Sequence, residues 1–121
     1  MGGSAGLRLL EAVRLLLASG WSRGADARDR DGHPVHPWDG AAESWSVLGA
    51  LVAVLEREAV TNGELPLEEV AAALYAIADV IHVDSLELWN DAVAESQADV
   101  VHTVDRAIGT YGDAYPHVAA P

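Results

Sequence analysis

Four segments of the chain repeat apolar residues at the spacing of an α-helix, and this pattern constrains the fold most strongly. Side chains three and four positions apart lie on one face of a helix, so each segment presents an apolar stripe. The predicted helices span about residues 5–18, 41–60 and 66–82, and a fourth runs from the capping sequence 96–99 to Gly109. The pattern therefore predicts an all-α fold, a compact four-helix domain.

Residues outside these helices complete the expected layout. Asp39 is predicted to be the N-cap of the second helix, because its carboxylate can accept a free backbone N–H. Residues 86–90 are expected to form a single helical turn. We expect residues 1–4 and 110–121 to be loosely ordered, as chain ends often are. The length of 121 residues predicts one domain over the whole chain.

The connection between the first two helices is polar and irregular. Residues 21–40 contain seven charged residues, two His and two Pro, and the Asp31-Gly32 pair is typical of a tight turn. We predict a polar hairpin-like loop between helices 1 and 2. Irregular segments of this length inside a small domain are uncommon, and they are often functional.

Composition excludes several classes of function. The chain has no Cys, which excludes a disulfide, a Cys-ligated zinc site and a thiol nucleophile. The formal charge of −12 argues against nucleic acid and anionic membranes as partners, because both repel an acidic surface. No apolar run of about 18 residues is present, so we expect no membrane span and a cytoplasmic protein.

The charge is divided unevenly along the chain. Residues 1–38 carry five Arg against four acidic residues, whereas residues 39–121 carry two Arg against fifteen acidic residues. Such asymmetry is typical of an interaction face, although the two parts can equally attract each other within one fold. An anion site, if the chain has one, is therefore expected in the Arg-bearing loop.

Two polar segments are the candidate site: the loop and the Trp89-Asn90-Asp91 sequence. Carboxylates can move protons, Arg can hold an anion, and Trp and Asn can bind a ligand. The candidate catalytic residues are Asp26, Asp29 and Asp91. The candidate ligand-binding residues are Trp21, Arg23, Arg28, Trp38, Trp45, Trp89 and Asn90. The competing interpretation is a solvent-exposed hairpin with surface ion pairs, and an Asn-Asp pair that only ends a helical turn.

The sequence favours neither a metal nor a cofactor. Asp79 and His82, like His102 and Asp105, are three residues apart, a spacing that occurs in metal sites of helical bundles. The same spacing is common on solvated helix faces, and the chain has no Glu-x-x-His motif. No glycine-rich phosphate loop follows a predicted strand. We therefore expect no bound metal and no cofactor.

Residues 7–109 contain an ordered series of short motifs. They are Leu9-Leu10-Glu11, GWSRGA from Gly20, Ala27-Arg28-Asp29, Gly32-x-x-Val35, WSVLGAL from Trp45, Trp89-Asn90-Asp91 and DRAI from Asp105. In this order they resemble an uncharacterised family of small actinobacterial and actinophage proteins. The resemblance implies that Ser22 and Ser46 stand where many members have Cys. It also implies a structural or ligand-binding role for the loop and for Asn90-Asp91, but no activity.

Three functions fit these features. The first is a small soluble binding or accessory protein that takes a small-molecule ligand and self-associates as a homodimer or higher homo-oligomer. The alternative is a cofactor-independent acid/base enzyme of actinobacterial specialised metabolism, in which loop Asp residues move protons and Arg28 positions the substrate. A further alternative is a phage or host-defence regulator that binds a basic partner. The sequence does not decide whether the protein is an enzyme.

Overall fold

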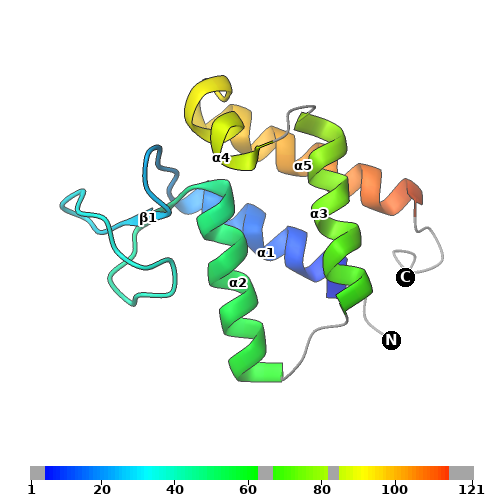
Figure 1. Ribbon diagram of the computed structural model, residues 1–121, viewed down its shortest axis with the longest axis horizontal. Helices are drawn as coiled ribbons and strands as arrows, with labels where there is room; N and C mark the ends of the chain where they lie inside the picture. Colours follow the sequence, from blue (N-terminus) through cyan, green and yellow to red (C-terminus); the bar gives the residue numbers. More distant parts are fainter. Residues whose placement is uncertain (1–4, 63–66, 82–84, 115–121) are drawn as a thin grey trace.

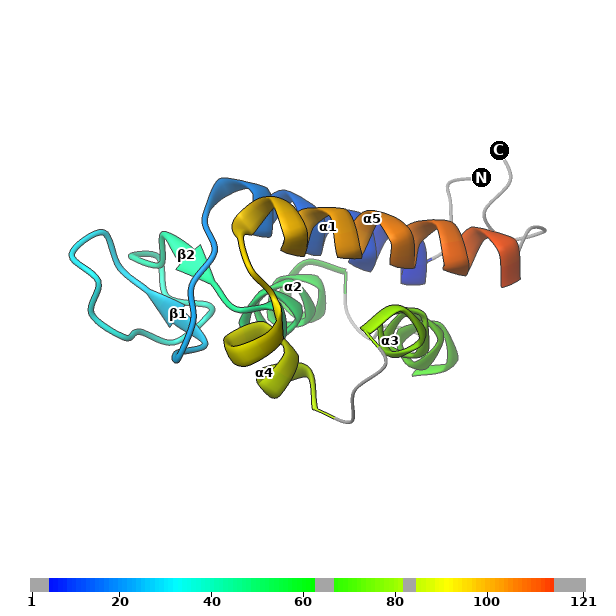
Figure 2. The ribbon, with the colours of Figure 1, turned by 90° about the horizontal axis from the view of Figure 1, so that it is seen from above.

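A computed structural model describes residues 5–62, 67–81 and 85–114 of the chain. Four long helices in these residues form two crossed layers (Figure 1). They are α1 (Ala5–Ser19), α2 (Val47–Asn62), α3 (Leu67–Ile81) and α5 (Gln97–Ala114). Figure 2 shows α1 beside α5 in one layer, with α2 and α3 crossing them in the other. The fold is mainly helical, as predicted.

Helix α1 lies at the centre of the packing. It contacts α2, α3 and α5, and its buried side chains include Leu9, Leu10, Val13 and Leu17. These positions follow the helical spacing seen in the sequence, so burial of this stripe removes a continuous apolar surface from water. The boundaries expected for this helix, residues 5–18, agree with the structure to within one residue.

A fifth, short helix lies between α3 and α5. Helix α4 (Leu86–Leu88) begins at Ser85, whose Oγ accepts the Leu88 N–H at 3.1 Å. The chain continues directly into a π-helical turn, η1 (Trp89–Val93), in which the Ala94 N–H reaches back to the Trp89 carbonyl at 2.8 Å. The single turn expected at residues 86–90 is therefore longer, and its second half is wider than an α-helix.

The connection between α1 and α2, residues 20–46, is called the polar loop below. It contains a two-stranded antiparallel sheet in which β1 (Ala27–Arg28) pairs with β2 (Ser44–Trp45). A tight turn lies at the expected place, because the Gly32 N–H donates to the Asp29 carbonyl at 3.0 Å. Chain segments also pair around this turn, because the Asp29 N–H donates to the His33 carbonyl at 2.9 Å and the Val35 N–H donates to the Ala27 carbonyl at 3.0 Å. The pairing of β1 with β2 is additional to this small hairpin, so the loop has more structure than a simple hairpin.

The predicted start of the second helix is wrong. Helix α2 begins at Val47, not near residue 41, because residues 44–45 pair with β1 and Ser46 caps the helix. The Ser46 Oγ accepts the Gly49 N–H at 2.9 Å. Asp39, expected as the cap, instead accepts the Ala41 N–H at 2.8 Å and stabilises a turn within the loop.

The predicted end of the last helix is also too early. Helix α5 continues beyond Gly109 to Ala114, and Tyr111 is buried in the core. Residues 110–114, for which loose order was expected, belong to this helix, and the buried ring of Tyr111 packs this turn against the domain. The expected loose order of the chain end stays a prediction. Residues 1–4 and 115–121, and the expected boundary residues Pro66 and His82, lie outside the described residues.

The capping sequence before α5 is confirmed. The Ser96 Oγ accepts the Asp99 N–H at 3.1 Å, which satisfies one of the free donors in the first turn. The Asp99 carboxylate accepts the backbone N–H of Glu95, at 3.1 Å, rather than that of Ser96. Among the described residues, no helix is both long and apolar enough to cross a membrane.

The first turn of α2 packs directly against the backbone of the polar loop. A Cβ atom placed on Gly49 would lie 1.8 Å from the carbonyl oxygen of Asp26. That carbonyl also accepts the Ser46 N–H at 3.1 Å, so it cannot move away without loss of a hydrogen bond. Only glycine permits this close approach, and the approach fixes the position of the loop on the helix.

We predict opposite effects for two Gly→Ala substitutions in helices. Gly49→Ala forces a backbone clash and should destabilise the domain by about 1–3 kcal/mol or more. Gly109→Ala meets nothing within 4 Å and should stabilise the domain by about 0.5–1 kcal/mol, because Ala has the higher helix propensity. Urea unfolding followed by far-UV circular dichroism measures both. A Gly49→Ala protein as stable as the wild type would contradict the packing.

Candidate functional site

A buried asparagine joins the polar loop to two helices. Asn90 is 0% exposed. Its Oδ1 accepts the indole N–H of Trp21 at 2.8 Å and the backbone N–H of Val47 at 3.0 Å. Its Nδ2 donates to the carbonyl of Ser22 at 3.0 Å. The side chain therefore connects the start of the loop, the start of α2 and η1, and these contacts favour a structural role for Asn90.

The neighbouring Asp91 holds a second part of the loop. One carboxylate oxygen accepts the Gly24 N–H at 3.0 Å and the Asn90 Nδ2–H at 2.9 Å. The hydrogen bond from the Gly24 backbone, followed by that from Asn90 and the charge of Arg23, lowers the pKa of Asp91. A general acid or base working near neutral pH needs a raised pKa, so this carboxylate is better suited to anchoring the loop.

Both arginines proposed as ligand-binding residues donate to the protein itself. The Arg23 guanidinium donates to the carbonyl of Ala94 and lies 4.8 Å from the centre of the Trp21 ring. The Arg28 guanidinium donates to the carbonyls of Gly32, at 2.9 Å, and Arg23, at 3.0 Å. These bonds satisfy backbone groups that the irregular loop leaves without a partner in a helix or sheet.

Asp29 organises the turn at the tip of the loop. Its Oδ1 accepts the backbone N–H groups of Asp31 and His33, each at 2.9 Å. The bond from His33 is the largest cause of a lowered pKa at Asp29. Asp29, Asp31 and His33 also offer ligand atoms within 4.8 Å of one another. The turn itself explains this convergence, and Asp31 and His33 are exposed to solvent.

Of the helix residues considered as metal ligands, Asp79, His102 and Asp105 are described, and none of them belongs to a cluster of ligand atoms among the described residues. Asp105 forms an ion pair with Arg14 of α1, and the hydrogen bond that the guanidinium donates to Asp105 raises the pKa of Arg14. His102 is exposed on α5. His82 lies outside the described residues, so the pair that it forms with Asp79 stays untested.

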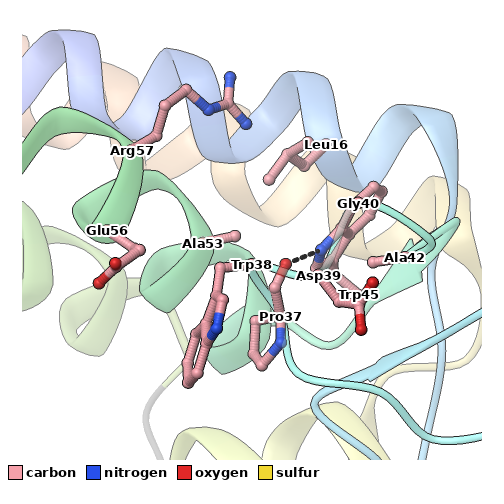
Figure 3. A pocket seen from close by; sticks show the side chains of 10 residues that line it. All are labelled: Leu16, Pro37, Trp38, Asp39, Gly40, Ala42, Trp45, Ala53, Glu56 and Arg57. Atoms are coloured by element: carbon pink, nitrogen blue, oxygen red, sulfur yellow. Dashed lines mark hydrogen bonds between the residues drawn. The ribbon is translucent and has the colours of Figure 1, made fainter. Parts of the chain in front are cut away.

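A cavity of about 520 Å³ lies between the polar loop and α2 (Figure 3). This volume is within the range of about 300–1,000 Å³ that is usual for small-molecule sites. We call it the tryptophan pocket. It is lined by Leu16 of α1, by Ala53, Glu56 and Arg57 of α2, and by Pro37, Trp38, Asp39, Gly40, Ala42 and Trp45 of the polar loop.

The two indole rings of the pocket are held in different ways. The Trp45 Nε1–H donates to the Pro37 carbonyl at 3.0 Å, the dashed line in Figure 3. Trp38 is 54% exposed and stacks on His36, with ring centroids 4.7 Å apart and 5° between the planes. Because His36 covers one face of the Trp38 ring, a ligand would meet its other face or an edge.

Three charged side chains border the tryptophan pocket. Glu56 and Arg57 belong to α2, and Asp39 belongs to the loop. None of the three forms an ion pair with another described residue. Asp39 uses one oxygen to accept the Ala41 N–H, which orients the carboxylate and leaves its second oxygen for a ligand. The pocket thus combines two aromatic walls with charged groups that form no ion pair within the described part of the chain.

A second hollow, of about 110 Å³, lies beside η1. Its lining includes Asp26, Ser46, Glu87 and Asp91, so it brings together two of the three candidate catalytic carboxylates. The volume is well below the usual range of ligand sites. A cluster of exposed carboxylates around so small a hollow is expected on an acidic protein, and we assign it no ligand.

With this geometry established, comparison with known proteins places the chain in a family. Residues 4–110 match the model of a protein family described as a family of unknown function, DUF6197. The chain belongs to DUF6197. No curated protein and no solved structure matches it. The match includes the polar loop, α2 and Asn90, so every residue of the tryptophan pocket lies within the part of the chain that the family model covers.

The residues proposed from the sequence are distributed over several places in this DUF6197 protein. Trp38 and Trp45 lie together in the tryptophan pocket, whereas Trp89 is buried in the core. Trp21 donates to Asn90 and is half-buried. Asp29 lies at the loop tip. Their assignment as binding or catalytic residues stays a prediction, and only the first two line a cavity of ligand size.

The two serines that stand at positions implied to be Cys have different surroundings. Ser46 caps α2, as described above. The Ser22 Oγ is buried, and no described residue is its hydrogen-bond partner. An unpaired buried hydroxyl is unfavourable, whereas a thiol, as a weak donor, tolerates such a place better. The environment of Ser22 is therefore compatible with Cys.

Sequence reasoning missed the α2 side of the pocket. Arg57 and Glu56 were part of a predicted helix, and nothing in the local pattern separates them from an ordinary solvated face. One signal was available: Arg57 and Arg106 are the two basic residues in a stretch with fifteen acidic ones. An isolated cation in such a stretch is a candidate for a specific contact.

The lowered pKa of Asp91 predicts how its contribution to stability depends on pH. A lowered folded-state pKa means that stability is present above the unfolded pKa, near 3.9, and is lost as the pH falls through the folded value. Asp91→Asn keeps the acceptor for Gly24 but removes the charge. At pH 7 it should cost less than about 1 kcal/mol, since the group is exposed. The difference from wild type should vanish in acid.

Urea unfolding at a series of pH values between 7 and 3 measures this difference. Asp26→Asn is the matched control, because it removes an exposed carboxylate with no side-chain hydrogen bond to a described residue. A stability difference for Asp91→Asn that stays constant across the series would show that the charge of Asp91 is not held by the loop.

Proposed function

We propose that this protein binds a small molecule in the tryptophan pocket. The observation that carries the proposal is the cavity itself, which joins a ligand-sized volume to two indole walls and to polar groups at its border. Ligand sites are typically mostly apolar, with a few polar groups that fix orientation. The proposal keeps Trp38 and Trp45 as ligand-binding residues, and it adds Asp39, Glu56 and Arg57.

The contacts of the loop support binding rather than acid/base catalysis. The pKa values of Asp29 and Asp91 are lowered by hydrogen bonds from the backbone, so both carboxylates are ionised and engaged at neutral pH. Arg28, proposed to position a substrate, is used by the carbonyls of the loop. A loop that is held by its own hydrogen bonds loses little conformational entropy on binding, so a preformed pocket beside it is suited to holding a ligand.

Binding can be tested with three small aromatic probes of different charge: benzyl alcohol, phenylacetate and benzyltrimethylammonium. We expect at least one of them to bind, with shifts of the Trp38 and Trp45 indole N–H signals in NMR spectra. Trp38→Leu should weaken that binding about threefold to tenfold, because aromatic pairs contribute roughly 0.5–1.5 kcal/mol beyond their buried area. Tyr75→Leu, at an exposed ring on α3 far from the pocket lining, should not.

The outcome separates a real site from a surface hollow. Binding by none of the probes, or binding that Trp38→Leu and Tyr75→Leu weaken equally, would refute the tryptophan pocket as a ligand site. The circular dichroism spectrum of each variant provides the control for folding.

We also propose self-association, supported by an apolar stripe on α3. Leu67, Ala71 and Leu74 lie at helical spacing on this helix, and Leu67 is 82% exposed. A second copy of the chain would remove such a stripe from water.

Sedimentation velocity should find dimers, and Leu74→Glu should shift them to monomers. Leu15→Glu, at an exposed position of α1, is the matched control. A wild-type protein that stays monomeric at all concentrations would refute this proposal.

A further inference from the structure

We propose that the ligand of the tryptophan pocket is an organic cation, such as an alkylated ammonium carried on a small apolar group. This inference rests on the proposed function of the pocket. It names the ligand's charge, which the size and the aromatic walls alone leave open. Three independent features of the structure carry it: the charges at the border, the available indole surface and the field of the whole chain.

The border of the pocket carries two negative side chains and one positive side chain, which favours a cation. Asp39 and Glu56 are carboxylates and Arg57 is the one guanidinium among the lining residues. Asp39 follows Trp38 in the sequence and lies on the loop side of the pocket. Its carboxylate is oriented by the hydrogen bond that it accepts from the Ala41 N–H. In Figure 3, the Arg57 side chain extends from α2 on the opposite side of Ala53 from Trp38. A cation beside Trp38 and Asp39 would therefore lie away from the guanidinium.

The aromatic walls supply the second feature. Indole rings attract cations through the negative face of their π system, and Trp is the best residue for this interaction. Trp38 has one face covered by His36 and is still half exposed, so ring surface is free for a ligand. The chain already uses this interaction elsewhere, because the Arg23 guanidinium lies 4.8 Å from the centre of the Trp21 ring.

The charge of the chain supplies the third feature. A net charge of −12 raises the local concentration of cations at the surface and repels anions. The loop was expected to attract an anion through its Arg residues, but Arg23 and Arg28 donate to backbone carbonyls instead. Neither of them, nor Arg30, lines the tryptophan pocket. An anionic ligand would therefore depend on Arg57 alone against the field of the protein.

The test compares the dissociation constants of benzyltrimethylammonium, benzyl alcohol and phenylacetate for the full chain, measured by NMR titration at low salt. We expect the cation to bind at least tenfold more tightly than either other probe. Its affinity should fall as salt is added, because salt screens the attraction of exposed charges.

Four variants identify the groups responsible. Asp39→Asn and Glu56→Gln should each weaken the cation about threefold to tenfold, the scale of a unit charge a few ångströms away at a protein surface. Asn at position 39 can still accept the Ala41 N–H, so the loop should keep its shape. Arg57→Gln should strengthen the cation, because it removes a repulsive charge. Asp79→Asn, an exposed carboxylate on α3, controls for the change in net charge.

The possible results separate the inference from the function on which it rests. Tighter binding of phenylacetate that is lost in Arg57→Gln would overturn the cation and keep the pocket as a ligand site. Equal binding of all three probes, or equal effects of Asp39→Asn and Asp79→Asn, would also overturn the cation alone. Failure of every probe to bind would overturn both the inference and the proposed function.

Discussion

The hydrogen bonds of Asn90 are the interaction on which the rest of the structure depends. One buried amide accepts from Trp21 and Val47 and donates to Ser22, so three segments distant in sequence share one side chain. A buried polar group left without its partner costs about 1–3 kcal/mol, and loss of this amide would orphan several groups at once. The polar loop and α2 form two walls of the tryptophan pocket. Asn90 therefore determines the geometry of a site that it does not touch.

The polar loop shows how charged residues can build structure rather than function. A segment of this length without helix or broad sheet leaves many backbone groups unpaired, and each needs a partner when it is withdrawn from water. Arg28 supplies donors to two carbonyls, Asp29 accepts two N–H groups, and Asp91 accepts one more from Gly24. The charges that made the loop look like an active site are thus largely used by the loop itself. The charged groups that border the tryptophan pocket, Asp39, Glu56 and Arg57, are not among those that hold the loop in this way.

The accuracy of the sequence prediction depended on the range of the interactions involved. Helix α1 was predicted to within a residue because its apolar spacing is a local property of the chain. The start of α2 was missed because Trp45, which fits the helical stripe, belongs to β2 and pairs with Ala27 of β1, which lies much earlier in the loop. The pocket was found only in part: Trp38 and Trp45 stood out by type, but their meeting with Arg57 depends on how α2 packs against the loop. Such a contact leaves no periodic signal in the sequence.

The exposed indole of Trp38 connects the structure of the loop to the ligand binding that we propose. A large aromatic ring that is 54% exposed gives up part of the free energy that burial would provide. The stack with His36 nevertheless holds the ring in one orientation before any ligand arrives. Ordering a side chain costs about 0.5–1.5 kcal/mol on binding, and a ring that is already ordered avoids much of this cost. The hydrogen bond from Trp45 to Pro37 acts in the same way on the second indole. Both aromatic walls are therefore preorganised by the loop, and the net negative charge of the chain is the reason that we propose a cation rather than an anion as their ligand.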